Sequence, residues 1–159
     1  MSSQRIQVND TLTADVRVRK QQDPRPMAIP VILVVEDHPV MRETLVQILR
    51  WAPVNTCTAA TGSEALTLLR QTTPDLTILD MELPDGISGI DILGCVRNTP
   101  RLAAMPVLLH TAESGAVDLI EAQSADLVLL KPVDPDHLIK LVHRLLGLPD
   151  EGQKRAATR

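Results

Sequence analysis

The chain has 159 residues, a net charge of −4 at pH 7 and 44% hydrophobic residues, but no Phe, no Tyr and a single Trp. This length suits one ordinary domain, whose core aliphatic side chains must fill. The acidic excess lies in the middle of the chain and stacking aromatics are missing, which argues against nucleic-acid binding by the folded part.

No apolar run approaches the roughly 18 residues that a membrane span needs. The N-terminus also lacks the hydrophobic stretch of a secretory signal. We therefore expect a soluble, cytoplasmic protein without a membrane partner.

The first 28 residues are polar and end in the Pro-containing stretch 23–26. We interpret residues 1–28 as an N-terminal tail that is disordered. Apolar residues alternate with polar ones over 11–18, so a short strand there is the minority interpretation. The folded domain is predicted over residues 29–148, and a short polar tail over 149–159.

From Pro30 onward, apolar runs alternate with helical patterns, which is typical of repeated β-α units around a parallel sheet. Strands are predicted at 31–35, 54–59, 76–80, 106–111 and 126–131. Helices are predicted at 39–51, 63–71, 89–97, 114–123 and from Asp134 to Gly147.

Capping residues and apolar stripes support the first and last of these helices. Pro39 suits a first helical turn, and Trp51 is expected at the far end of the same helix. Asp134 is a typical N-cap, and Gly147 a typical stop. The inward faces are predicted to be Met41, Leu45, Ile48 and Leu49 in the first helix, and Leu138, Leu141, Val142 and Leu145 in the last.

Polar residues follow four of the predicted strands: Glu36 and Asp37, then Asp80, Thr111 and Lys131. If these strands are parallel neighbours, their tips meet at the sheet edge where open α/β sheets bind ligands. Three carboxylates, a hydroxyl and an ammonium would then share one pocket. Such a set suits Mg²⁺ together with a phosphoryl group, since hard oxygen ligands hold Mg²⁺ and Lys and Thr donate to phosphoryl oxygens.

Each of these residues alone has a simpler explanation. An Asp or Thr at a strand end is usually a turn or helix cap, the acid pair would be solvated, and a lone Lys is usually on the surface. We prefer the functional interpretation because the simple one is needed at four successive strand tips.

The same positions resemble the receiver domain of bacterial two-component response regulators, over about residues 29–148. The motifs that carry the resemblance are Val34-Val35-Glu36-Asp37, Leu79-Asp80-Met81-Glu82-Leu83-Pro84-Asp85-Gly86, His110-Thr111-Ala112 and Leu130-Lys131-Pro132. The resemblance implies an α/β, flavodoxin-like (βα)5 fold, in which a doubly wound parallel sheet has the strand order 2-1-3-4-5.

The resemblance also implies roles for individual residues. Asp80 would be the phosphoacceptor. Glu36 and Asp37, with Asp80 and the backbone carbonyl of Glu82, would hold Mg²⁺. Thr111 and Lys131 would bind the phosphoryl oxygens, and the Lys131-Pro132 peptide bond would be cis.

The sequence departs from the family pattern at Val128, where an aromatic residue usually stands and rotates on phosphorylation. A valine has no ring to swing toward Thr111, so a switch would have to work differently. By resemblance, Ala112 and Val128 modulate the site, and so do the two acids Glu82 and Glu113. We hypothesise that both carboxylates affect the access of the water that hydrolyses the phosphoryl group.

The remaining ionisable and sulfur side chains are given no role. Cys57 and Cys95 lack metal-binding spacing and are predicted to be buried small hydrophobes. The four histidines have no shared acid at ligand spacing, so a metal or phosphorelay role is not expected for His38, His110, His137 or His143.

The leading hypothesis is a stand-alone receiver that accepts a phosphoryl group from a histidine kinase or phosphotransfer protein and acts on a downstream protein effector. It would not be an enzyme beyond accepting and slowly losing its own phosphoryl group. A phosphorylation-independent interaction module is the alternative, and an Mg²⁺-dependent aspartyl-phosphate phosphatase is a weaker one. No nucleic-acid partner is expected, and homodimer formation is left open.

Overall fold

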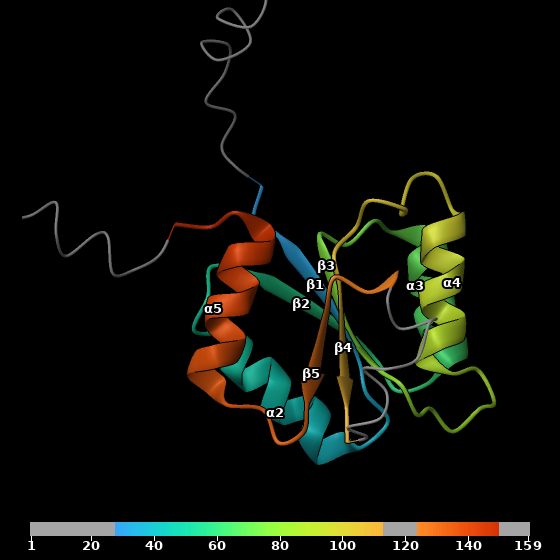
Figure 1. Cartoon of the computed structure of the whole chain (residues 1–159), viewed down its shortest axis with the longest axis horizontal. Coiled ribbons are helices and arrows are strands. Elements are labelled where there is room, and N and C mark those ends of the chain that lie inside the picture. Colours follow the sequence, from blue (N-terminus) through green and yellow to red (C-terminus); the bar gives the residue numbers. More distant parts are fainter. Residues whose placement is uncertain (1–27, 113–123, 150–159) are drawn as a thin grey trace, which may run out of the picture.

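The computed structural model describes residues 28–112 and 124–149, which form a sheet with helices on both faces (Figure 1). Within these residues the strands are β1 (Val31–Val35), β2 (Asn55–Ala59), β3 (Leu76–Asp80), β4 (Val107–Thr111) and β5 (Leu127–Leu130). The helices of the same part are α2 (Pro39–Leu49), α3 (Gly62–Gln71), α4 (Gly89–Asn98) and α5 (Pro135–Leu146).

The strands lie in the order β2-β1-β3-β4-β5, and every neighbouring pair is parallel. Figure 1 shows α2 and α5 on one side of the sheet and α3 and α4 on the other. The predicted fold class and strand order are therefore confirmed. Because all strands run the same way, the ends of β1, β3, β4 and β5 bring their polar residues to one edge.

Two aliphatic clusters, one on each face, hold the layers together. Successive side chains of a strand point to opposite faces: Leu33 and Val35 pack toward α3 and α4, whereas Ile32 and Val34 pack toward α2 and α5. Coverage of both faces explains why β3 and β4 are buried at every position.

Local capping explains where the helices begin and end. The His38 side chain accepts from the Met41 backbone N–H at the start of α2, and the Asp134 side chain caps α5 as predicted. Gly147 ends α5 in the left-handed conformation, with φ 63°. The Lys131-Pro132 peptide bond is cis, as the resemblance implied.

Two expectations were wrong in detail. Helix α2 ends at Leu49, two residues before its predicted end, because the chain turns tightly ahead of Pro53, which cannot continue a helix. Trp51 follows the helix and is exposed. Cys95 was expected to be buried but is exposed, because it falls on the solvent side of α4, and Cys57 is only partly buried.

Some predictions lie outside the described residues: the helix over 114–123, the N-terminal tail up to residue 27, and residues 150–159. Among the helices that the structure does describe, none is both long and apolar enough to cross a membrane.

Candidate functional site

A pocket of about 420 Å³ opens at the edge of the sheet where the strands end. It contains all five polar residues that the sequence placed at strand tips. The lining residues are Glu36, Asp37, His38, Val40, Met41, Thr44, Asp80, Glu82, Thr111, Ala112 and Lys131. The predicted convergence of four strand tips on one site is therefore what the structure shows.

Three carboxylates lie close together in this pocket. Glu36, Asp37 and Asp80 each offer an oxygen atom, and these atoms lie within 4.8 Å of one another. Glu36 and Asp80 are buried at the ends of β1 and β3, whereas Asp37 is exposed at the pocket mouth. Three like charges at this spacing repel one another unless a cation lies between them.

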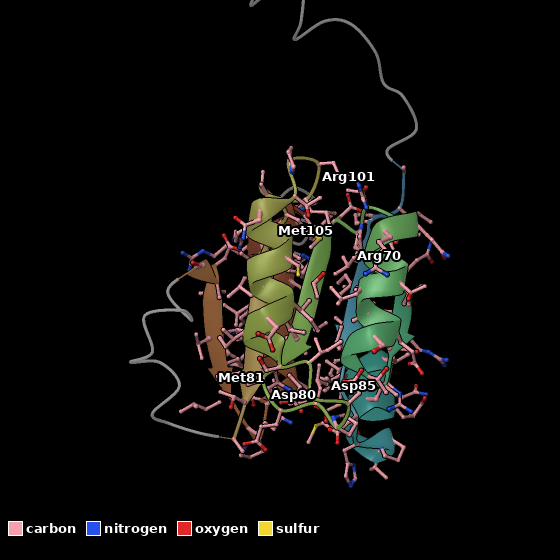
Figure 2. All side chains as sticks on the ribbon, turned by 90° about the vertical axis from the view of Figure 1, so that its right-hand side faces the viewer. Arg70, Asp80, Met81, Asp85, Arg101 and Met105 are labelled. Carbon is pink, nitrogen blue, oxygen red and sulfur yellow. The ribbon has the colours of Figure 1, made fainter. Side chains whose placement is uncertain are left out.

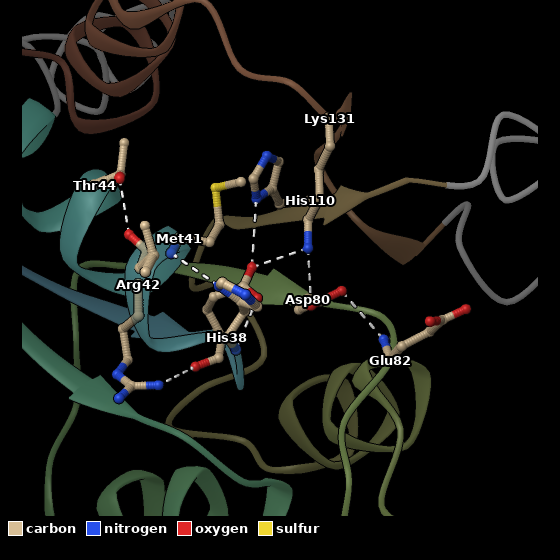
Figure 3. A network of polar contacts seen from close by, with 10 residues as sticks. His38, Met41, Arg42, Thr44, Asp80, Glu82, His110 and Lys131 are labelled. Atoms are coloured by element: carbon tan, nitrogen blue, oxygen red, sulfur yellow. Dashed lines mark hydrogen bonds and ion pairs between the residues drawn. The ribbon is translucent and has the colours of Figure 1, made fainter.

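Lys131 provides one such cation from the segment after β5 (Figure 3). Its Nζ donates to Glu36 Oε2 and to Asp80 Oδ2, both at 3.0 Å. Burial works against the charged form of Lys131, but the hydrogen bonds to Asp80 and Glu36 outweigh it and raise its pKa. The lysine is therefore firmly charged in the pocket.

The pKa of Glu36 is raised, whereas the pKa of a carboxylate in an ion pair is usually lowered. Burial raises its pKa above the usual 4.5, and the hydrogen bond from Lys131 offsets this only in part. The nearby charge of Asp80 raises the pKa further. An additional cation in the pocket would relieve this unfavourable charge.

Asp80 lies at the end of the fully buried strand β3. Its Oδ2 accepts from Lys131, and its Oδ1 accepts from the backbone N–H of Glu82 at 3.2 Å. Thr111, at the end of the neighbouring β4, is also buried and lines the pocket. Both oxygens of Asp80 are thus oriented before any ligand enters.

Arg42 is a residue of the site that sequence reasoning missed. Its Nη1 donates to the backbone carbonyls of Glu36 at 2.8 Å and of Asp37 at 3.1 Å (Figure 3). The His38 backbone N–H also donates to Glu36 Oε1 at 3.2 Å. These contacts hold the acid pair in place, and the available signal was an arginine in the first turns of the helix that follows the pair.

His110 was also missed, because no ligand spacing marked it. It lies beside Asp80 in the β3–β4 register, and its Nδ1 is 3.9 Å from Glu36 Oε2. Burial lowers its pKa to about 4, and the Lys131 charge acts in the same direction. Among the described residues neither ring nitrogen has a hydrogen-bond partner, so His110 is a neutral, buried neighbour of the acids.

Of the four residues expected to modulate the site, two line the pocket, one packs against the core and one lies outside the described residues. Glu82 and Ala112 line the pocket, and the Glu82 side chain is exposed. Val128 lies on β5, partly buried, and packs against the cluster under α3 and α4 rather than lining the pocket. Glu113 lies outside the described residues.

The donor set fits Mg²⁺. Carboxylate and carbonyl oxygens are the ligands this ion prefers, and the pocket offers three carboxylates with the Glu82 backbone nearby. Burial, and to a lesser extent the charge of Asp80, raises the pKa of Glu36, so a cation bound beside these carboxylates would stabilise the ionised form of Glu36.

Sequence comparison identifies relatives over most of the described part. The profile of the response regulator receiver domain matches residues 32–143. DNA-binding response regulator MtrA of Mycolicibacterium smegmatis is 36% identical over 117 residues, which are 72% of this chain and 50% of that protein. Transcriptional regulatory protein AfsQ1 of Streptomyces coelicolor is 36% identical over 107 residues, 66% of this chain and 46% of that protein.

Solved structures with the same fold include two bacterial proteins. Response regulator TrrA of Thermotoga maritima, in complex with Mg²⁺ and BeF, has a TM-score of 0.69 and 35% identity, covering 74% of this chain and 100% of that one. Chemotaxis protein CheY4 of Vibrio cholerae has a TM-score of 0.69 and 29% identity, covering 75% and 100%. The chain spans about half the length of the curated relatives that it matches.

Proposed function

The chain belongs to the family of response regulator receiver domains, and from this premise we propose that it accepts a phosphoryl group on Asp80 and signals through protein contacts. The donor would be a histidine kinase or a phosphotransfer protein. The observation that supports this most strongly is the convergence of Glu36, Asp37, Asp80, Thr111 and Lys131 on one pocket.

In this proposal Glu36, Asp37, Asp80 and the backbone carbonyl of Glu82 hold Mg²⁺. When bound, the ion screens the repulsion between the Asp80 carboxylate and a polyanionic phosphoryl donor. An Asp80 oxygen forms the new bond to phosphorus, and the bond from phosphorus to the donor atom breaks, its electron pair leaving with the donor. The related response regulator TrrA was solved in complex with Mg²⁺ and BeF, which supports Mg²⁺ as the ion for a pocket of this fold.

The remaining residues prepare the pocket for that product. Lys131 already donates to Asp80 Oδ2, so its ammonium is placed to donate to an oxygen of a phosphoryl group on Asp80. The Thr111 hydroxyl would donate to another of these oxygens. Burial of Asp80 would limit the approach of water from the carboxyl side of the acyl phosphate.

We propose no enzymatic turnover beyond this transfer and slow self-dephosphorylation. The phosphatase alternative predicts many turnovers on a generic phosphoester, whereas a receiver is modified once. A phosphorylation-independent module is the other alternative, and it is favoured by Val128, which brings no aromatic ring to the position where receivers usually carry one.

The relatives give no support to our prediction that nucleic acid is not a partner, because MtrA and AfsQ1 are named as DNA-binding and transcriptional regulators. The matched residues cover about half of those proteins. We propose protein contacts as the action of the receiver part itself, and a cytoplasmic location for it.

Intact-mass measurement after incubation with acetyl phosphate and Mg²⁺ tests the proposal. We expect a labile adduct of about 80 Da, the mass of one phosphoryl group, as for an acyl phosphate. The adduct should disappear in Asp80→Ala and in metal-free protein. Folded protein that binds Mg²⁺ but forms no adduct would favour the phosphorylation-independent module instead.

A further inference from the structure

The loop between β3 and α4 is anchored to a helix that takes no part in the pocket. This loop, residues 81–88, follows Asp80 and carries Glu82. Its Asp85 reaches the N-terminus of α3: Oδ1 accepts from the Gly62 backbone N–H at 3.0 Å, and Oδ2 accepts from the Ser63 backbone N–H at 2.8 Å and the Ser63 hydroxyl at 2.7 Å. Figure 2 shows Asp80 and Asp85 at the same end of the molecule.

Close packing supports the same anchor. A Cβ added to Gly62 would come within 2.5 Å of the Cβ of Ile87, so the first residue of α3 must be small for the loop to lie against it. The Thr61 side chain separately accepts from the Glu64 N–H. The α3 N-terminus therefore satisfies its first two N–H groups with Asp85 from the loop and the third with its own cap.

The charge of Asp85 suits this contact. A carboxylate at a helix N-terminus is stabilised by the helix dipole as well as by its hydrogen bonds. The Ser63 hydroxyl and backbone lower the pKa of Asp85 to about 2, so the side chain is ionised at every physiological pH. The anchor is thus present whenever the domain is folded near neutral pH.

The other end of the loop is fixed by the strand. The Glu82 N–H donates to Asp80 Oδ1 at 3.2 Å, and the Gly89 N–H donates to the Met81 carbonyl at 2.9 Å. The segment from Glu82 to Asp85 therefore runs between two fixed points, one at Asp80 and one at α3. The backbone of Glu82 is therefore constrained from both sides.

We propose that Asp85 is a positioning residue for the Mg²⁺ site, which by binding the α3 N-terminus holds the Glu82 carbonyl toward the acids. This inference rests on the proposed function, because the Glu82 carbonyl matters only if the pocket holds the ion. It also assigns α3 a part in the site, so a contact that displaces the start of α3 would weaken Mg²⁺ binding.

The test compares Asp85→Ala and Asp85→Asn with the parent and with Asp75→Ala. Asp75 is a matched control: its exposed carboxylate accepts from the Val31 N–H at 2.8 Å and joins two segments 44 residues apart, but at the opposite edge of the sheet. Two quantities are measured on each folded protein. One is the dissociation constant for Mg²⁺ by calorimetric titration, and the other is the hydrogen-exchange rate of the Glu82 amide without metal.

We expect Asp85→Ala to raise the dissociation constant for Mg²⁺ about three- to tenfold, less than the roughly 10- to 100-fold typical of direct outer-shell partners. Exchange at the Glu82 amide should become faster, since the loop loses one of its two anchors. Asp85→Asn should give an intermediate change because one amide oxygen still accepts, and Asp75→Ala should change neither quantity.

An Asp85→Ala variant with the parent's Mg²⁺ affinity would overturn the positioning role, even if the parent is phosphorylated normally. Equal losses of affinity in Asp85→Ala and Asp75→Ala would also overturn it, by showing a general loss of stability. A parent that binds Mg²⁺ but takes no phosphoryl group would contradict the proposed function and leave the comparison of Mg²⁺ affinities to decide the role of Asp85. A parent that binds no Mg²⁺ would overturn both.

Discussion

Charged residues gather at both ends of the parallel strands, but they have different roles at the carboxyl ends and at the amino ends. At the edge where the strands end, Glu36, Asp80 and Lys131 face a pocket, and burial raises the pKa of Glu36. At the edge where they begin, Arg97 and Asp126 form an ion pair at 2.8 Å and also bind backbone groups. Figure 2 places Asp80 at one end of the molecule and Arg101 at the other.

The opposite edge is built from arginine donors and backbone acceptors. Arg97 on α4 donates to the carbonyls of Ser124, Ala103 and Met105, while Arg101 donates to the carbonyls of Leu69 and Thr72 at the end of α3. Removing one partner of such a paired charge destabilises the fold because the other partner is left unpaired, whereas charge held for a ligand costs stability until the ligand binds. The effect of a charged residue on stability therefore distinguishes residues that anchor the fold from residues that serve a ligand site.

The largest effect on stability is expected at the anchoring edge. Arg97→Ala removes a donor to three carbonyls and to Asp126, and leaves these acceptors without their partner. We expect the free energy of unfolding to fall by about 3 kcal/mol, since a single hydrogen bond to a charged group contributes roughly 1.5 to 3 kcal/mol. Urea denaturation measures this change, and formation of the phosphoryl adduct should persist under conditions where the variant is folded.

Arg50→Ala is the control for this variant. Arg50 is an exposed arginine just after α2, and no side-chain hydrogen bond of Arg50 is found among the described residues. It should change stability by less than about 0.5 kcal/mol, as surface substitutions usually do. Equal losses of unfolding free energy in Arg97→Ala and Arg50→Ala would contradict the anchoring role of Arg97.

The next largest effect is a loss of folding stability at low pH, caused by His110 beside the pocket. His110 has a pKa lowered to about 4 in the folded protein, whereas the ordinary value is 6.5. The unfolded chain therefore takes up a proton first, so the contribution of neutral His110 is complete above about pH 6.5 and is lost as the pH falls toward 4. Between pH 7 and 4.5 this loss should amount to about 2 kcal/mol.

His110→Leu isolates this contribution. Glu36, Asp80 and Lys131 stay beside His110 in both proteins, so the difference between the two stability curves reports mainly the imidazole. We expect the parent to lose stability relative to the variant as the pH is lowered in metal-free buffer. Parallel curves from pH 7 to 4.5 would show that His110 is protonated as easily in the fold as in the unfolded chain.

A smaller effect of opposite sign is expected at Glu36. Burial raises its folded-state pKa above 4.5, so the free energy of unfolding falls as the pH rises through 4.5 toward the folded-state pKa. Glu36→Gln should therefore raise the free energy of unfolding at pH 7 by about 1 kcal/mol, a usual size for a stabilising change at a functional site. Its Mg²⁺ affinity should fall in the same protein.

Glu43→Gln provides the comparison for Glu36→Gln. Glu43 is an exposed acid on α2, and its replacement should alter neither stability nor Mg²⁺ affinity. A Glu36→Gln variant less stable than the parent would show that the hydrogen bond to Lys131 outweighs the cost of burial, contrary to the direction of its pKa.

The pocket was predictable from sequence because strand ends and parallel pairing fix where a residue lies. Four of the five apolar runs placed Glu36, Asp80, Thr111 and Lys131 at the carboxyl ends of neighbouring parallel strands, and each of these residues lines the pocket. Helix starts were also predictable where a single residue decides them, as Asp134 does for α5.

What could not be predicted depends on side-chain reach across elements. Arg42 bonds backward to carbonyls five and six residues earlier, and Asp85 bonds to a helix 22 and 23 residues away. Neither contact leaves a periodic signal. Cys95 was misplaced because α4 turns one face to water, and a single cysteine does not show which face it occupies.

The smallest effect on stability, and the one that separates function from folding most clearly, is expected at Glu82. Its exposed side chain lines the pocket mouth, whereas only its backbone N–H takes part in the described hydrogen bonds. Glu82→Ala should therefore leave the free energy of unfolding within about 0.5 kcal/mol of the parent.

The same variant should lose its phosphoryl group about two- to threefold faster than the parent, because removing the side chain opens a path for the attacking water. Such a factor corresponds to a barrier change of about 0.5 kcal/mol. The decay of the adduct by intact mass measures this, with Glu43→Ala as a control in which the lost carboxylate is exposed on α2 and does not line the pocket. Equal lifetimes in the parent and Glu82→Ala would show that water reaches the phosphoryl group by another route.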